Sequence, residues 1–120
     1  MPWYAAHAIL YVRFKAGKQR RFLVWENVLL VRARTAREAW RKAQRRARED
    51  EGDSGGTFRW AGRRAEWVFA GLRKVVAVSA RSEGRLGDGD EITYNEYEVD
   101  DAAALERLVE GASVSVEYGA

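Results

Sequence analysis

The alternation of apolar and polar positions is most informative between residues 22 and 47. The first part of this stretch is a long apolar run typical of a strand, and the second part repeats small apolar residues at helical spacing. Thr35 and Glu38 form a capping-box sequence, which predicts that the helix begins just after Thr35. Its apolar stripe spans about 100° of the helix surface, and we expect it to lie close on a sheet with Trp40 as its anchor. The stripe consists of Ala36, Ala39, Trp40, Ala43 and Ala47.

The rest of the chain reads mainly as further strands. Residues 3–14 are aromatic and β-branched, and a turn at residues 15–18 predicts a hairpin with the strand over residues 21–32. The first strand is apolar on both faces, as expected of a central strand in a covered sheet or of one that faces a partner. Further strands are expected at 57–60, 66–79, 91–99 and 113–118, with a second helix from residue 100 or 101 to Gly111 that buries Leu105, Leu108 and Val109.

The predicted order of elements is β-β-α-β-β-β-α-β. This order favours the α+β class, with a mostly antiparallel sheet of five to six strands and two helices on one face. If the strand at residues 57–60 is an insertion, the elements after the first strand follow the ferredoxin-like order β-α-β-β-α-β. We expect residues 1–120 to form a single domain, because no linker divides them.

Composition excludes several classes of protein. The chain has no cysteine, so a disulfide scaffold, a thiol nucleophile and a cysteine zinc site are ruled out. The N-terminal apolar run is too short and interrupted for a signal peptide or a membrane span, which predicts a soluble cytoplasmic protein. Arginine outnumbers lysine 17 to 4 amid abundant alanine and glycine, which we interpret as the codon usage of a GC-rich bacterial genome.

Charge is distributed unevenly along the chain. Residues 1–60 carry a net charge of +8 and residues 61–120 a net charge of −5. The predicted first helix presents an arginine stripe, in which each like-charge i,i+4 step costs about 0.2–0.5 kcal/mol. We therefore expect an acidic group near this stripe, from an acidic protein, from nucleic acid or from the acidic half of the chain itself. The stripe consists of Arg37, Arg41, Arg45 and Arg48.

A second candidate site combines polar and aromatic residues of the hairpin, namely His7, Trp25, Glu26 and Asn27. Glu26 interrupts an apolar strand, so it is either an acid or base held in an aromatic setting or a structural carboxylate, paired with an arginine on a neighbouring strand or with Asn27 at a strand irregularity. We favour the structural interpretation, because ion pairs that serve only the structure perturb carboxylates as readily as catalytic roles do. His7 is the single histidine. It could act as a base beside Glu26 or Glu96, but its apolar neighbours favour a packed structural role. The sequence predicts no metal site and no cofactor.

Several short segments resemble those of one bacterial family. They include Trp3-Tyr4-Ala5, Val24-Trp25-Glu26-Asn27, Thr35 with Glu38-Ala39, the segment Glu66-Trp67-Val68-Phe69-Ala70-Gly71-Leu72-Arg73-Lys74, and the segment Gly87-Asp88-Gly89-Asp90-Glu91-Ile92-Thr93-Tyr94. With these segments the chain resembles the family called domain of unknown function 4288. The resemblance implies a free-standing bacterial domain. It brings no activity, cofactor or catalytic residue.

Three functions follow from these patterns, in descending order of support. The first is a non-enzymatic binding or interaction module that self-associates as a homodimer, indicated by the doubly apolar hairpin, the five tryptophans and the complementary charge of the two halves. The alternative is a nucleic-acid-binding protein that uses the basic helix of residues 35–50. The third is a small enzyme in which Glu26 acts as the acid or base.

Overall fold

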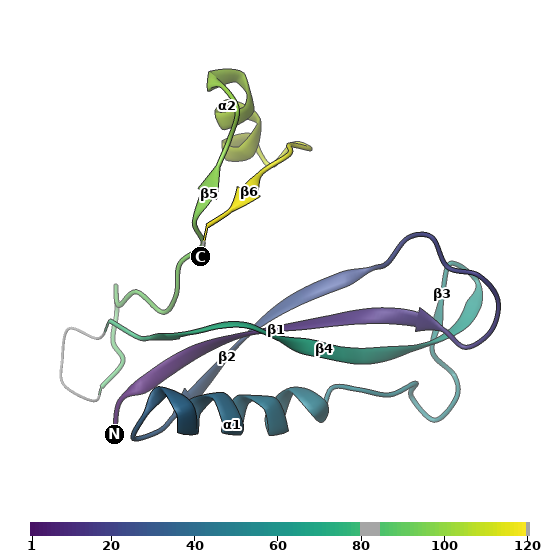
Figure 1. The fold of residues 1–120 in the computed structure, drawn as a ribbon, viewed down its shortest axis with the longest axis horizontal. Coiled ribbons are helices and arrows are strands. Elements are labelled where there is room, and N and C mark those ends of the chain that lie inside the picture. The colour runs from purple at the N-terminus through teal and green to yellow at the C-terminus, as the bar shows by residue number, and fades with distance from the viewer. Residues whose placement is uncertain (80–84, 120) are drawn as a thin grey trace.

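A four-stranded antiparallel sheet with one helix on it forms the larger part of the protein. The computed structural model describes residues 1–79 and 85–119, and Figure 1 shows their arrangement. The sheet has the order β2-β1-β4-β3, so β1 is central and β2 lies at one edge. These strands span Trp3–Phe14 (β1), Val24–Arg32 (β2), Arg59–Trp60 (β3) and Arg63–Ala77 (β4).

The helix α1 (Ala36–Arg48) covers one face of this sheet (Figure 1). Thr35 caps it as predicted, since its side-chain oxygen accepts a hydrogen bond from the Glu38 backbone N–H at 3.1 Å. Alternate residues of β1 meet the helix, because successive strand side chains point to opposite faces. The contact is built from small residues on both sides, with Ala39, Ala43 and Ala47 of α1 packed over Ala6, Ala8 and Leu10 of β1.

The predicted anchor of this helix is wrong. Trp40 is 39% exposed, and the buried residues of α1 are three alanines spaced four apart. This spacing defines the centre of the contact, and a helix that approaches a sheet this closely leaves no room for an indole there. Trp40 therefore lies at the margin of the stripe, and its ring reaches solvent.

The C-terminal elements form a separate unit. Among the described residues, the strands β5 (Tyr97–Glu98) and β6 (Glu117–Tyr118) pair only with each other, and α2 (Ala102–Glu110) lies between them in the chain. In Figure 1 this unit projects away from the larger sheet. A contact with that sheet is made by Arg73, whose guanidinium carbon lies 3.7 Å from the centre of the Tyr118 ring.

The α+β class and the predicted order of elements are confirmed. Three finer expectations are wrong: within residues 1–79 and 85–119 the strands form one sheet of four and one of two, the two helices do not share a face, and no strand returns to the larger sheet as the ferredoxin-like order requires. The cause lies in residues 91–99, predicted as one strand. Only Tyr97–Glu98 is regular, and Glu91 makes an isolated bridge to Ser79. The last strand consequently pairs with β5 and never joins the larger sheet.

The second helix has the predicted ends but not the predicted buried stripe. The Asp101 side chain accepts a hydrogen bond from the Ala104 N–H at 2.7 Å, and Gly111 closes the helix with a left-handed φ of 77°. Ala104 is its buried residue, while Leu105 and Val109 are exposed. None of the helices in residues 1–79 and 85–119 is long and apolar enough to cross a membrane.

Candidate functional site

The outer face of the larger sheet, opposite α1, contains a buried polar cluster. His7 lies on this face because its neighbours in β1, Ala6 and Ala8, face the helix. The imidazole is fully buried, and its Nδ1 lies 2.6 Å from Oε2 of Glu26 on β2. Its Nε2 contacts Oγ1 of Thr93, which comes from the irregular segment before β5. In the neutral ring one nitrogen donates and the other accepts, so His7 joins the carboxylate and the hydroxyl in one chain.

This order of hydroxyl, imidazole and carboxylate matches that of a nucleophilic triad. The imidazole is fully buried, however, which favours a structural histidine that holds neighbouring segments together. The cluster instead holds Thr93 and its segment against β1 and β2. Glu26 thus pairs with a histidine, and not with the arginine that the sequence suggested.

Trp25 and Asn27 lie apart from His7 and Glu26. Neighbouring residues of β2 point to opposite faces, and Trp25 pairs in register with Leu10, which packs on the α1 side. The Trp25 ring lies 4.8 Å from that of Trp67 on β4, at an angle of 51°. The four residues that the sequence grouped as one site therefore belong to two sites on opposite faces.

A small cleft lies beside the two indoles, on the helix side of the sheet. It has a volume of about 280 Å³ and is lined by Leu10, Trp25, Asn27, Asp50 and Trp67. We call it the tryptophan cleft. Leu10 is buried beneath it. Asp50 comes from the turn that follows α1, so the end of the helix meets the two strands here.

The arginine stripe of α1 is open to solvent, as expected of a charged helix face. Arg37, Arg41 and Arg45 are exposed, and Arg48 lies 5.8 Å from the centre of the Phe69 ring. The exposed Trp40 lines a shallow hollow of about 450 Å³ together with Arg37 and Arg41. Guanidinium groups beside an open indole can contact phosphate and stack a base.

The outer edge of β2 is free of any strand in the described part of the chain. Three apolar side chains on its outer face are unusually open: Val24 is 50% exposed, and Val28 and Leu30 are each 43% exposed. The strand pairs with β1 over nine residues without a register shift. A long edge strand with exposed apolar side chains is a template for pairing with another chain.

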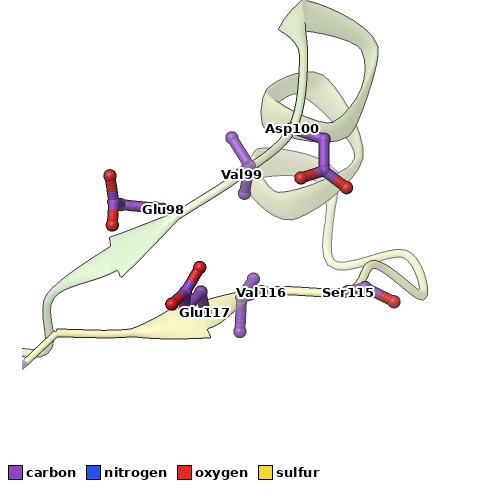
Figure 2. A pocket seen from close by; sticks show the side chains of 6 residues that line it. All are labelled: Glu98, Val99, Asp100, Ser115, Val116 and Glu117. Atoms are coloured by element: carbon purple, nitrogen blue, oxygen red, sulfur yellow. The ribbon is translucent and has the colours of Figure 1, made fainter.

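The C-terminal unit contains an acidic hollow of about 410 Å³. Figure 2 shows the carboxylates of Glu98, Asp100 and Glu117 around it, together with Val99, Ser115 and Val116. Ser115 has no imidazole beside it among these lining residues, so the hollow has no activated nucleophile. The acidic residues of this hollow belong to a difference in net charge between the two ends of the chain. Residues 1–79 carry a net charge of +11, whereas residues 95–119, which we call the acidic arm, carry −6.

Three residues of these sites were not predicted from the sequence patterns. Thr93 meets His7 across 86 positions, and no local pattern announces that contact. Trp67 was placed in a strand, but its pairing with Trp25 depends on the register of three strands. The sequence did contain a signal for Asp50. An acidic residue at the C-terminal end of a helix interacts unfavourably with the helix dipole, so its presence there suggests another role.

The family model described as "Domain of unknown function (DUF4288)" matches residues 3–94. The matched residues include the four-stranded sheet, α1 and the His7–Glu26–Thr93 cluster, whereas β5, α2 and β6 follow the match. No curated protein and no solved structure matches the chain.

Proposed function

The chain belongs to the DUF4288 family, whose description assigns no activity, and from its geometry we propose that it is a non-enzymatic interaction module that self-associates as a two-fold dimer. The observation that carries this proposal is the free edge of β2 together with its exposed apolar side chains. A symmetric dimer uses the same patch on both copies. An edge strand suits this use, because two identical strands can pair antiparallel about a two-fold axis.

The hydrogen-bonding pattern determines which groups are available on this edge. The Leu23 carbonyl accepts from Val12 of β1, and the Ala33 N–H donates to Pro2. Both backbone groups of a residue in an antiparallel pair point to the same neighbour. The odd-numbered residues of β2 therefore bond to β1, and the even-numbered ones direct their N–H and C=O groups outward. At the end of the strand Lys42 Nζ donates to the outward carbonyl of Arg32 at 2.5 Å.

One pairing register fits these residues best. If Leu29 lies on the two-fold axis, Glu26 of each copy lies opposite Arg32 of the other, and Val28 lies opposite Leu30. The charges in this register are opposite and the apolar side chains meet, and each such cross-strand pair contributes roughly 0.2–1 kcal/mol. A register shifted by one residue would pair even-numbered residues of one copy with odd-numbered residues of the other. The backbone groups of the odd-numbered residues already bond to β1, so such registers are excluded.

Light scattering after size exclusion tests the proposal. The wild-type chain is expected to have the mass of two copies at micromolar concentration. Leu30→Lys places a buried charge at the interface and is expected to raise the dimer Kd by about tenfold or more, since edge lysines prevent strand pairing. The matched control is Val109→Lys, at an exposed valine on α2, which should leave the mass unchanged.

The register has its own test. Arg32→Glu places carboxylates opposite each other at both ends of the pairing, so the dimer should weaken by about tenfold at low salt and by less at high salt. A wild-type chain that remains monomeric at high micromolar concentration would contradict the dimer. A dimer that is insensitive to both substitutions would place the interface elsewhere.

A second candidate function is nucleic-acid binding through α1, favoured by the exposed indole of Trp40, which lines one hollow together with Arg37 and Arg41. The net charge of +11 on residues 1–79 would attract a polyanion. Affinity for single-stranded RNA or DNA should then fall steeply with salt. Arg41→Glu combined with Arg45→Glu should abolish binding, and Trp40→Ala should weaken it roughly tenfold, in line with base stacking. Equal binding by the double variant would refute this candidate.

A further inference from the structure

The tryptophan cleft has the composition of a cation site. The indoles of Trp25 and Trp67 line it, Asp50 supplies a carboxylate and Asn27 supplies an amide. Aromatic faces carry negative charge density and attract ammonium groups that lie within about 6 Å of the ring centre. Trp25 is 54% exposed, so its ring is available without any movement of the core.

The end of α1 strengthens the negative field at this place. In Figure 1 the strands β1 and β4 continue beyond the last turn of the helix, and the cleft lies where this turn ends. A helix C-terminus carries about half a negative charge. Glu49, Asp50 and Glu51 follow directly, and Glu51 is fixed there because its carboxylate accepts the Phe69 N–H at 2.8 Å.

The last turn of α1 also carries three arginines, Arg45, Arg46 and Arg48. Arg46 Nη1 lies 3.1 Å from Oδ1 of Asp50, and this contact raises the pKa of Arg46. The second oxygen of Asp50, Oδ2, has no hydrogen bond within the described residues. Arg48 is occupied by the Phe69 ring. The cleft therefore offers a ligand one carboxylate oxygen beside the exposed indole of Trp25.

We propose that the tryptophan cleft binds an alkylammonium group. A metal ion is a poor fit, because Mg²⁺ or Ca²⁺ takes six or more oxygen ligands, and the lining offers one carboxylate and one amide. A volume of about 280 Å³ also lies just under the usual range for whole ligands, roughly 300–1,000 Å³. The cleft matches a headgroup or the tip of a side chain, with its methyl groups on Trp25 and Trp67 and its charge toward Asp50.

Choline chloride is a suitable probe, followed through the indole N–H signals in two-dimensional NMR. Saturable shifts of the Trp25 and Trp67 signals are expected, with a Kd on the order of 1 mM. The neutral isostere 3,3-dimethyl-1-butanol has the same shape without the charge and should bind at least about tenfold more weakly. Equal binding of the two would show an unselective apolar site and overturn the proposal.

Two variants locate the site. Asp50→Asn keeps the shape of the side chain and should weaken choline binding about three- to tenfold, and Trp25→Leu should weaken it about tenfold. Both residues lie at the surface, so the fold should persist, as circular dichroism would verify. Trp40→Leu, on the far flank of α1, is the control and should leave the affinity unchanged. Absence of any saturable shift, or full affinity in Asp50→Asn, would refute the assignment.

Discussion

His7 is the residue through which distant parts of the chain meet. It is buried between β1 and β2, and its two nitrogens contact Glu26 and Thr93. A buried polar atom that loses its partner costs about 1–3 kcal/mol. The stability of the protein should therefore depend on a threonine that lies in an irregular segment and belongs to no helix or strand.

The first prediction concerns this hydroxyl. Thr93→Val removes the partner of His7 Nε2 at nearly constant volume, and the free energy of unfolding should fall by about 1–3 kcal/mol, measured by urea denaturation. Tyr94→Phe is the control, because it removes a neighbouring hydroxyl while keeping the ring that stacks on Lys74. It should change stability by less than about 0.5 kcal/mol. A Thr93→Val variant as stable as wild type would show that the contact contributes nothing.

The second prediction concerns acid stability. Asp53 accepts a hydrogen bond from Lys15 and another from the Gly56 N–H at 3.0 Å, and these contacts lower the pKa of Asp53 below its usual 3.8. A carboxyl with a lowered pKa stabilises the fold above its unfolded pKa, and that contribution is lost as the pH falls through the folded value. Asp53→Asn should therefore lower Tm at pH 7, and the difference from wild type should shrink below pH 3.8. A difference that is constant from pH 7 to pH 2.5 would contradict this account.

At the scale of single elements, α1 illustrates what local patterns predict. Its start is announced by Thr35, whose side chain needs only the backbone of Glu38 as a partner. The alanine spacing likewise announces which face is buried. The exposure of Trp40 was not predicted. The width of the helix surface that is buried depends on how close the helix lies to β1, and residues of β1 set that distance.

The third prediction tests this close approach. Ala43 is fully buried among alanines of β1 and α1, so Ala43→Leu must push the helix from the sheet. Overpacking of this kind costs about 1–3 kcal/mol, measured as a fall in the free energy of unfolding. Ala36→Leu, on the same helix but exposed, is the control and should be nearly neutral. Equal effects of the two substitutions would contradict the packing described.

The strands show where such predictions stop. The strands expected at residues 57–60 and 66–79 do form a hairpin, in which Ala61 and Gly62 adopt the positive φ values of 52° and 75° that a two-residue turn requires. Residues 91–99 alternate as a strand should, yet only Tyr97–Glu98 pairs. Alternation shows that a segment could lie on a sheet. It does not show that the sheet has a free edge with which the segment can pair. The order of β2, β1 and β4 depends on contacts between residues far apart in the chain.

At the scale of the whole molecule, charge and packing divide the chain in the same place. The hydrophobic clusters of the fold lie between Tyr4 and Val75, and residues 1–79 hold nearly all of the positive charge. The acidic arm, residues 95–119, contributes a nine-residue helix with one buried side chain, Ala104. Isolated helices shorter than about 12–15 residues are marginal in water. The arm therefore adds little to the stability of the larger sheet.

The fourth prediction follows from this division. A chain ending at residue 94 retains the whole family match and both hydrophobic clusters, and loses the contact of Arg73 with Tyr118. An exposed cation–π contact contributes about 0.5–1 kcal/mol, so the free energy of unfolding should fall by no more than that in urea titrations. The shortened chain should still unfold in one cooperative transition, as is expected of a small single domain.

The same variant separates the two candidate functions. Its net charge rises from +3 to +9, so a nucleic-acid interface on α1 should bind more tightly and with a steeper dependence on salt. The β2 edge is untouched by the deletion, so a dimer formed through β2 should persist with the same Kd. Loss of the dimer on removal of the arm would show that the arm, and not the edge strand, holds the copies together, because Leu30 and Arg32 remain in place.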